Sequence, residues 1–323
     1  MMRRISLSLA ITLVATHLSA APKPQSFLRG NPDDFTHSKA ISGGYALMGG
    51  GGDVDEAFRW LLKKADGGDV VVLRASGSDG YNDYLFRELG ITVDSVETLL
   101  FTSKKQSQHP SVARKLEGAE MIFIAGGDQS RYIRYWKDTP VEDLINAHAR
   151  AGKPIGGTSA GLAIIGGYSY SAMHQGDLTS KLAVKYPNHK YITIEDDFLK
   201  LPLLTNILTD SHFSERNRQG RLLVMLRKIA LDYEDLVITG IGVDEATALC
   251  IDANGGAKVI SEVEGGTHFI RVHQADPIDV EATQASMSTR SPRDGSFRFT
   301  EMLSMLAANP QNNNPIQTME DIK

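Results

Sequence analysis

Hydrophobic residues follow two patterns that alternate along most of the chain. Short apolar runs rich in valine and isoleucine, bounded by glycine and polar residues, are typical of buried strands. Between these runs, apolar residues recur every three or four positions, as at Val54, Phe58 and Leu61, which predicts helices. Strands that alternate with helices predict an α/β fold whose parallel sheet carries helices on both faces.

The predicted elements succeed one another from residue 45 to about residue 272. Strands are predicted at residues 45–48, 69–76, 91–101, 120–127 and 235–243 and in "TALCID", "AKVIS" and "HFIRV". Helices are predicted at residues 54–62, 82–90, 130–136, 141–152 and 215–230, with another directly after residue 159. "ALCIDANGGAKVIS" predicts an antiparallel hairpin. We therefore expect one α/β domain over residues 41–275, with a polar leader before it (22–40) and a C-terminal extension with a loose tail after it (276–323).

The first 21 residues predict a secretory signal peptide. Arg3 and Arg4 precede an apolar stretch over residues 5–18, and small residues then lead to a cleavage site near Ala21. The apolar stretch is shorter than the roughly 20 residues that a membrane-spanning helix needs. An uncleaved N-terminal anchor is the alternative. We predict export to the periplasm or beyond the cell, without a membrane anchor.

Composition excludes several classes of function. The sequence is 41% hydrophobic and 23% charged, and loss of the two leader arginines leaves 32 basic and 39 acidic residues, a net charge of −7. Such a balance argues against nucleic acid as a partner. Cys250 is the only cysteine, which excludes an internal disulfide and any zinc site built on several thiolates. The sequence also lacks an H-E-x-x-H motif, so we expect neither a metal nor a cofactor.

The stretch Gly157-Thr158-Ser159-Ala160-Gly161 fits the G-x-S-x-G pattern of a nucleophile elbow. In that motif a strained strand-to-helix turn lifts a serine hydroxyl above the edge of the sheet, and the flanking glycines leave room for a tight approach. The N–H of Ala160 would then point to where an oxyanion forms. The alternative is a glycine-rich turn whose serine caps a helix.

A serine nucleophile needs a base, and His212 is the histidine best placed to be one. It follows a hydrophobic run and precedes a predicted helix in "LTDSHFSERNRQGR", whereas the other histidines lack a supporting pattern. Arg216, Arg218 and Arg221 lie nearby, which indicates either a pocket for a carboxylate or a solvated basic helix face.

Two further turns carry candidate groups. Asp244 and Glu245 directly follow a predicted strand, and since neighbouring residues point to opposite sides, only one of them is expected to meet the histidine. The sequence does not choose between them. In "AGGDQS", Gly127 can donate a backbone N–H to an oxyanion and Gln129 can bond a substrate amide, although a plain strand-to-helix turn explains the stretch equally well.

Two other classes of function compete with a hydrolase. "MGGGGDVDEAF" follows a predicted strand, as a nucleotide-binding loop would, but Val54 occupies the third glycine position of G-x-G-x-x-G and no Gly-Lys-Ser/Thr follows. A binding protein that keeps the fold without catalysis is the second alternative.

Taken together, "GGTSAG", "GGDQ", "DSHFSERNRQGR" and "GIGVDEATA" resemble, in order and spacing, the cyanophycinase-like serine peptidases of peptidase family S51. The resemblance covers roughly residues 42–272. It implies a class I glutamine amidotransferase-like fold, with a doubly wound, mostly parallel, flavodoxin-like sheet. It also implies a serine peptidase that works as a homodimer on peptide or isopeptide substrates, often β-aspartyl ones.

The resemblance also implies roles for single residues. Ser159 would be the nucleophile, His212 the base and Glu245, rather than Asp244, its acid partner. The oxyanion donors would be the N–H groups of Ala160 and of Gly127 or its neighbour. The residues that would line the substrate pocket are Gln129, Asp210, Ser211, Arg216, Arg218 and Arg221.

Two departures from the family pattern flank that pocket. Ser211 stands where cyanophycinases usually carry glutamine, and residues 174–198 read as an insertion. The resemblance therefore does not carry cyanophycin over as the substrate. A general or α-aspartyl dipeptidase of the same family is the alternative.

Overall fold

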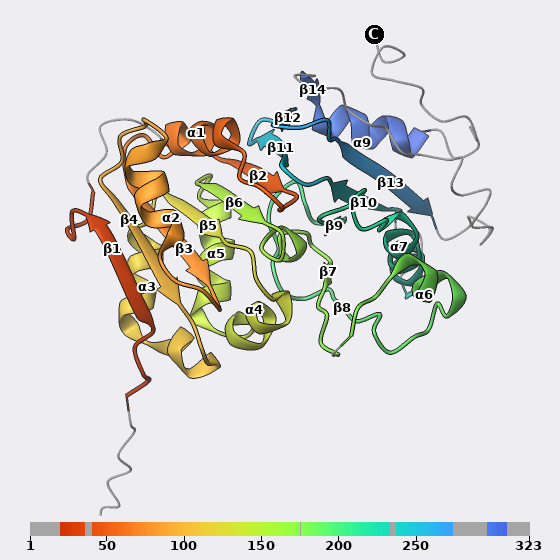
Figure 1. The fold of residues 1–323 in the computed structure, drawn as a ribbon, viewed down its shortest axis with the longest axis horizontal. Helices are drawn as coiled ribbons and strands as arrows, with labels where there is room; N and C mark the ends of the chain where they lie inside the picture. The colour runs from red at the N-terminus through yellow and green to blue at the C-terminus, as the bar shows by residue number, and fades with distance from the viewer. Residues whose placement is uncertain (1–19, 36–40, 175, 233–236, 274–295, 309–323) are drawn as a thin grey trace, which may run out of the picture.

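The structure is a computed structural model that describes residues 20–35, 41–174, 176–232, 237–273 and 296–308. A nine-stranded mixed sheet runs through its centre, and a smaller three-stranded sheet stands beside it (Figure 1). The predicted α/β fold with a mostly parallel central sheet is confirmed.

The large sheet has a parallel middle and antiparallel flanks. Its strands lie in the order β1 (Gln25–Gly30), β4 (Ser95–Leu100), β3 (Asp69–Arg74), β5 (Met121–Ile124), β6 (Pro154–Thr158), β2 (Gly44–Met48), β11 (Thr247–Asp252), β12 (Gly256–Ser261) and β14 (Ser296–Arg298). Neighbours from β4 to β2 are parallel, and the remaining pairs are antiparallel. The carboxyl ends of the parallel strands therefore meet at one edge, where ligand sites form in sheets of this kind.

Side chains alternate between the two faces of the central strands. Val70 and Val72 pack in the core beneath α1 (Asp55–Lys64), α2 (Gly80–Asp83) and the π-helix Tyr84–Glu88. Val71 and Leu73 face the other core, which is covered by α3 (Pro110–Gly118), α4 (Gln129–Trp136) and α5 (Pro140–Arg150). Because both faces are buried, these strands appear in the sequence as continuous apolar runs.

The small sheet carries its own core. It consists of β9 (Ile207–Asp210), β10 (Val237–Val243) and β13 (Thr267–His273), and α6 (Ser180–Lys185) and α7 (Gln219–Asp232) pack with it. Strand β9 is parallel to β10, and β13 is antiparallel to it. The residues after β10 lead straight into β11 of the large sheet, so the turn at residues 244–246 joins the two sheets. A two-stranded ribbon, β7 (Ser169–Tyr170) and β8 (Ile194–Glu195), lies nearby.

Segments that lie outside both predicted domain boundaries take part in the fold. Part of the polar leader forms β1, which pairs with β4, while Asn82 donates a 2.8 Å hydrogen bond to the carbonyl of Phe27. An edge strand stays partly exposed, so its polar sequence gives no strand signal. In the C-terminal extension, β14 pairs with β12, and α9 (Phe299–Ala308) buries Phe299 and Met302.

Three predicted helices differ from the structure. After Ser159 the chain makes only a turn and the 3₁₀ helix Leu162–Ile164, because Gly166 and Gly167 bring the backbone against residues 205–207. Helix α7 starts at residue 219 rather than 215, and residues 82–90 form the end of α2 and a π-helix. The other predicted strands and helices are present, with ends shifted by a few residues.

The signal-peptide prediction concerns residues 1–19, which lie outside the described residues, and the small residues Ala20 and Ala21 that follow. Within the described ranges, no helix combines the length and apolar character that a membrane span requires.

The C-terminal helix gives a direct stability test. Phe299 has no exposed surface and packs in the core that includes the central strands. We expect Phe299→Ala to lower the free energy of unfolding by about 3–5 kcal/mol in urea titrations, because it removes a buried aromatic side chain. Glu301→Ala, on the exposed side of α9, should change it by less than about 1 kcal/mol. An unchanged midpoint for Phe299→Ala would mean that α9 is no part of the core.

Candidate active site

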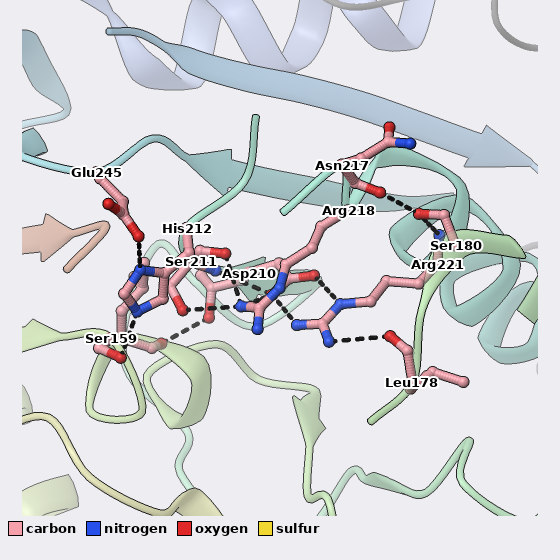
Figure 2. Close-up of polar contacts among 12 residues, drawn as sticks. Ser159, Leu178, Ser180, Asp210, Ser211, His212, Asn217, Arg218, Arg221 and Glu245 are labelled. Carbon is pink, nitrogen blue, oxygen red and sulfur yellow. Dashed lines mark hydrogen bonds and ion pairs between the residues drawn. The ribbon is translucent and has the colours of Figure 1, made fainter. Parts of the chain in front are cut away.

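Three side chains from three different strand ends meet in one line (Figure 2). Ser159 follows β6, His212 follows β9, and Glu245 follows β10. The Ser159 hydroxyl lies 2.8 Å from His212 Nε2, and Glu245 Oε1 lies 2.5 Å from His212 Nδ1. Because the carboxylate only accepts hydrogen bonds, Nδ1 carries the proton and Nε2 is free to accept the proton of the serine.

The turn at Ser159 has the strain that a nucleophile elbow requires. Ser159 adopts a left-handed backbone with φ of 52°. A Cβ on Gly161 would lie 2.1 Å from the carbonyl oxygen of Ile124, and one on Gly157 would lie 2.4 Å from Ile165. Glycine is therefore needed at both flanking positions, for the reason that the sequence pattern indicated.

Three consecutive carbonyl groups at the end of β2 hold the turns that carry the three side chains. The carbonyl of Met48 accepts the N–H of Ser159 at 3.1 Å. The next carbonyl, of Gly49, accepts the N–H of His212 at 2.9 Å, and that of Gly50 accepts the N–H of Ala246 at 2.8 Å. The main chain after β2 thus ties all three turns to one short segment.

The glycine run that was considered for nucleotide binding lies directly against these side chains. Gly50 and Gly51 have φ of 87° and 73°. A Cβ on Gly50 would lie 2.7 Å from the His212 ring and 2.9 Å from Ser159 Cβ, and one on Gly51 would lie 2.4 Å from Glu245. The four glycines at the end of a strand indicated that another group approaches the backbone closely there. The sequence did not indicate which residues that group would be.

Burial favours the neutral form of the His212 ring. The loss of solvent lowers its pKa below the ordinary value, the hydrogen bond from Nδ1 to Glu245 opposes that shift, and the charges of Arg216 and Arg218 lower the pKa further. A neutral imidazole is the form that can accept a proton.

The structure distinguishes the two adjacent acids that the sequence left equivalent. Glu245 points to His212, whereas Asp244 turns to the other side of the chain and bonds His268 and the amide of Gly266. This opposite orientation follows from the alternation of side chains at the end of a strand.

The predicted oxyanion donors lie on both sides of Ser159. A Cβ on Gly126 would lie 3.4 Å from Ser159 Cβ, so the turn that contains Gly127 runs beside the serine. Tyr132 fixes this turn through its hydroxyl, which lies 2.8 Å and 2.9 Å from the carbonyls of Ala125 and Gly126. Within the described chain, no backbone carbonyl accepts the amide of Ala160 or Gly127. Both amides are therefore available to an external acceptor.

The arginines near His212 fall into two groups. Arg221 exposes only 3% of its surface and forms two hydrogen bonds, of 2.6 and 2.8 Å, with Asp210, which exposes 2% (Figure 2). Because their charges pair with each other and both side chains are buried, these two residues offer little surface to a substrate. Removing one partner of such a pair typically costs about 3–5 kcal/mol.

Arg218 shares Asp210 with Arg221 and lies closer to the triad. Its Nη1 donates to the carbonyl of Ser211 at 2.7 Å and lies 3.3 Å from Asp210. Two arginines thus share one carboxylate, and Asp177 adds a further negative charge that acts on both of them. Arg216, in the next turn, is exposed, and Gln129 begins α4 in a half-buried position.

The insertion-like segment closes the far side of this arginine cluster. The carbonyl of Leu178 accepts a hydrogen bond from Arg221 at 3.2 Å, and the hydroxyl of Ser180 accepts the N–H of Arg221 at 3.1 Å. Leu178 and Ser180 of the insertion-like segment therefore contact the arginine cluster directly, whereas the sequence indicated only that the segment lies near the site. Among the described residues, no group of three or more histidine, cysteine and acidic side chains is arranged to hold a metal ion.

Comparison with known proteins identifies the family of this chain. A model of peptidase family S51 matches residues 80–259, more than half of the chain. A cyanophycinase of Trichormus variabilis is 31% identical over 179 residues, which is 55% of this chain and 54% of the relative. A cyanophycinase of Synechococcus elongatus is 28% identical over 204 residues, 63% of this chain and 55% of the relative. The chain thus matches about half the length of these relatives.

A solved structure supports the fold. The crystal structure of a peptidase from an acI-B1 Actinobacterium aligns with 74% of this chain and 97% of its own, with a TM-score of 0.51 and 15% identity. The molecule is an α/β protein of the kind that carries a serine at a strand-to-turn elbow. It belongs to peptidase family S51.

The close approach of Gly50 to the triad can be tested by adding one methyl group. We expect Gly50→Ala to slow labelling of Ser159 by a fluorophosphonate on the order of 100-fold, because the new Cβ displaces the His212 ring. Gly90→Ala is the matched control, since Gly90 has a similar φ of 70° but nothing within 4 Å of its Cβ position. Equal labelling rates in the two variants would show that backbone strain, rather than contact with His212, is responsible.

Proposed function

We propose that this protein is a serine peptidase that uses Ser159 as nucleophile, His212 as general base and Glu245 as the acid that orients the base. The observation that carries the proposal is the line of two short hydrogen bonds from Glu245 through His212 to Ser159. Membership of peptidase family S51 and the cyanophycinase relatives support it.

In the proposed reaction His212 Nε2 takes the proton of Ser159 while the hydroxyl oxygen attacks a peptide-type carbonyl carbon. The oxyanion of the tetrahedral intermediate would accept hydrogen bonds from the amides of Ala160 and of Gly127 or its neighbour. His212 then passes its proton to the leaving amine, and water hydrolyses the acyl-enzyme by the same route in reverse. Glu245 accepts the hydrogen bond from Nδ1 and stabilises the imidazolium.

The charge around the site supports a substrate with a carboxylate near the scissile bond. Arg216 and Arg218 bring positive charge close to His212, and Arg218 shares the Asp210 carboxylate with Arg221. A β-aspartyl peptide carries a free α-carboxylate next to the carbonyl that is attacked, which such a charge would hold. We therefore propose β-aspartyl dipeptides or peptides as the substrate class.

Two alternatives keep specific support. An α-aspartyl or general dipeptidase would use the same triad, and the altered pocket at Ser211 and residues 174–198 favours it over cleavage of cyanophycin. A nucleotide-binding or other ligand-binding module without catalysis is less well supported, because the glycine run 49–52 is in contact with the triad. The homodimer that the family resemblance implies stays a prediction for sedimentation analysis.

The proposal is tested with four substrates and one variant. We would incubate the protein and Ser159→Ala with β-Asp-Arg, β-Asp-Leu, α-Asp-Arg and cyanophycin, and measure released amino acids by mass spectrometry. We expect cleavage of the β-linked dipeptides, reduced about 10⁴-fold or more in Ser159→Ala. Cleavage of α-Asp-Arg alone would select the α-aspartyl dipeptidase. Wild-type turnover in Ser159→Ala would remove the serine mechanism.

The pH dependence follows from the His212 pKa. The rate falls as the pH drops through this pKa, because a protonated imidazole cannot accept the serine proton. Arg216 lowers the pKa by disfavouring the charged ring, so Arg216→Gln should raise the pKa and move the acid limb to higher pH. The pH profile of fluorophosphonate labelling measures the His212 pKa without a substrate, and the shift in pKa should become smaller at high salt.

Arg87→Gln is the control, because Arg87 is exposed and is not among the charges that act on His212. An equal shift of the acid limb in Arg87→Gln would contradict the assignment to Arg216.

We further propose that the protein is exported, on the basis of residues 1–21 alone. Expression of the full chain in a Gram-negative host should give a periplasmic or secreted product whose N-terminus lies near residue 22, as determined by Edman sequencing. A cytoplasmic product that begins at Met1 would contradict export.

A further inference from the structure

Asp244 is a buried carboxylate next to the proposed triad that the mechanism does not use. It exposes 1% of its surface and follows directly after β10. Its Oδ1 accepts the amide of Ser214 at 3.0 Å, its Oδ2 accepts the amide of Gly266 at 2.8 Å, and the His268 ring nitrogen Nε2 lies 3.0 Å from Oδ1 and 3.1 Å from Oδ2. Since the carboxylate can only accept, His268 donates through Nε2–H.

These contacts connect the segment that carries the base with the segment that carries the acid. Ser214 lies two residues after His212, and Asp244 lies one residue before Glu245. The amide of Phe213 also donates to the carbonyl of Val243 at 3.2 Å, and the Phe213 ring packs on Gly242, where a Cβ would come within 2.4 Å. The Asp244 amide in turn donates to the carbonyl of Gly266 at 3.1 Å. The two segments are thereby fastened to each other and to the start of β13.

Both segments need such support because both contain unfavourable backbone. His212 and Ala246 have φ of 45° and 46°, in the left-handed region that residues with side chains rarely adopt. Such conformations persist where surrounding contacts enforce them, and they concentrate at functional sites. The carbonyls of Gly49 and Gly50 hold these two turns from the side of β2, and Asp244 lies on the side of β13.

We infer that Asp244 is a positioning residue, which together with His268 sets the distance and angle between His212 and Glu245. The inference rests on the proposed function, since it assigns the group that keeps the proposed base and acid in register. The two adjacent acids then have separate roles. Glu245 bonds the His212 ring, and Asp244 bonds the backbone of the segment that carries His212.

The ionisation of Asp244 is consistent with this task. Burial alone would raise its pKa, but the contacts with His268 and Ser214 and the amide of Gly266 outweigh burial and lower the pKa to about 2. These contacts thus favour the charged carboxylate, which is the form that can accept all of these hydrogen bonds.

The test compares Asp244→Asn with Asp69→Asn in the full chain. Asparagine has the size of aspartate, but its NH₂ group must face at least one of the three donors around Asp244, which are the amides of Ser214 and Gly266 and the His268 Nε2–H. We expect kcat on the cleaved dipeptide to fall on the order of 10- to 100-fold with KM unchanged. Asp69 also accepts a backbone amide and a serine hydroxyl, from Phe35 at 3.1 Å and Ser95 at 2.5 Å, but it lies at the start of β3, so its substitution should leave kcat unchanged.

A second measurement separates this inference from the proposed function. The Nδ1 proton that His212 shares with Glu245 should give a far-downfield proton resonance, which His212→Gln abolishes. We expect Asp244→Asn to shift or broaden it and Asp69→Asn to leave it in place. An unchanged resonance together with unchanged kcat in Asp244→Asn would overturn the inference. If Ser159→Ala kept full turnover, the proposed mechanism would fail, while the resonance would still report whether Asp244 orients His212 and Glu245.

Substitution of His268 guards against a folding failure in Asp244→Asn. His268→Gln places an N–H donor near the position of Nε2 and should retain most of the wild-type kcat, whereas His268→Ala should lose activity in the same direction as Asp244→Asn. Equal kcat values in the two His268 variants would contradict a role for this hydrogen bond.

Discussion

The proposed active site depends on one short stretch of main chain. The carbonyls of Met48, Gly49 and Gly50 accept one amide from each of the turns at Ser159, His212 and Glu245. Three carbonyls in a row can serve three turns only if the chain leaves β2 without side chains in the way, which explains the glycines at 49–52. The elbow, the base and the acid therefore share a common reference point in the backbone, although they lie far apart in the sequence.

The site also depends on the packing of the two sheets. Ser159 follows a strand of the large sheet, whereas His212 and Glu245 follow strands of the small sheet. The turn at residues 244–246 connects β10 of the small sheet to β11 of the large sheet. The position of Glu245 therefore depends on both sheets. Burial at this junction favours the neutral imidazole, and Arg216 and Arg218 place positive charge close to it. A neutral base beside positive charge is suited to attack on an anionic substrate.

The sequence allowed prediction of the features that are set by local chemistry. The strand "MIFI" and the elbow at Ser159 were predictable because burial and backbone strain leave a direct mark on a few neighbouring residues. The residues alone did not allow a choice between Asp244 and Glu245, because that choice depends on how one strand end is rotated; only the family resemblance pointed to Glu245. The sequence also did not allow prediction of the ion pair between Arg221 and Asp210, because a charge pattern does not show whether an arginine faces solvent or a buried carboxylate. Strand β1 lacked a strand signal because edge strands are partly exposed and polar. Helix α9 is apolar, but it is a single short helix that stands apart from the alternating strands and helices, so its sequence did not indicate what it packs against.

The reliance on carbonyl groups has a consequence for how such a protein can diverge. The positions of the three reactive side chains are set mainly by peptide groups, which every amino acid provides, and by a few glycines. The walls of the proposed substrate pocket would come from side chains of α7 and from the segment around Leu178 and Ser180, which contacts Arg221. Substitutions in those walls can therefore change which molecule is accepted while the chemistry beneath them stays the same. In evolutionary terms, reactivity and selectivity are inherited on separate parts of this chain.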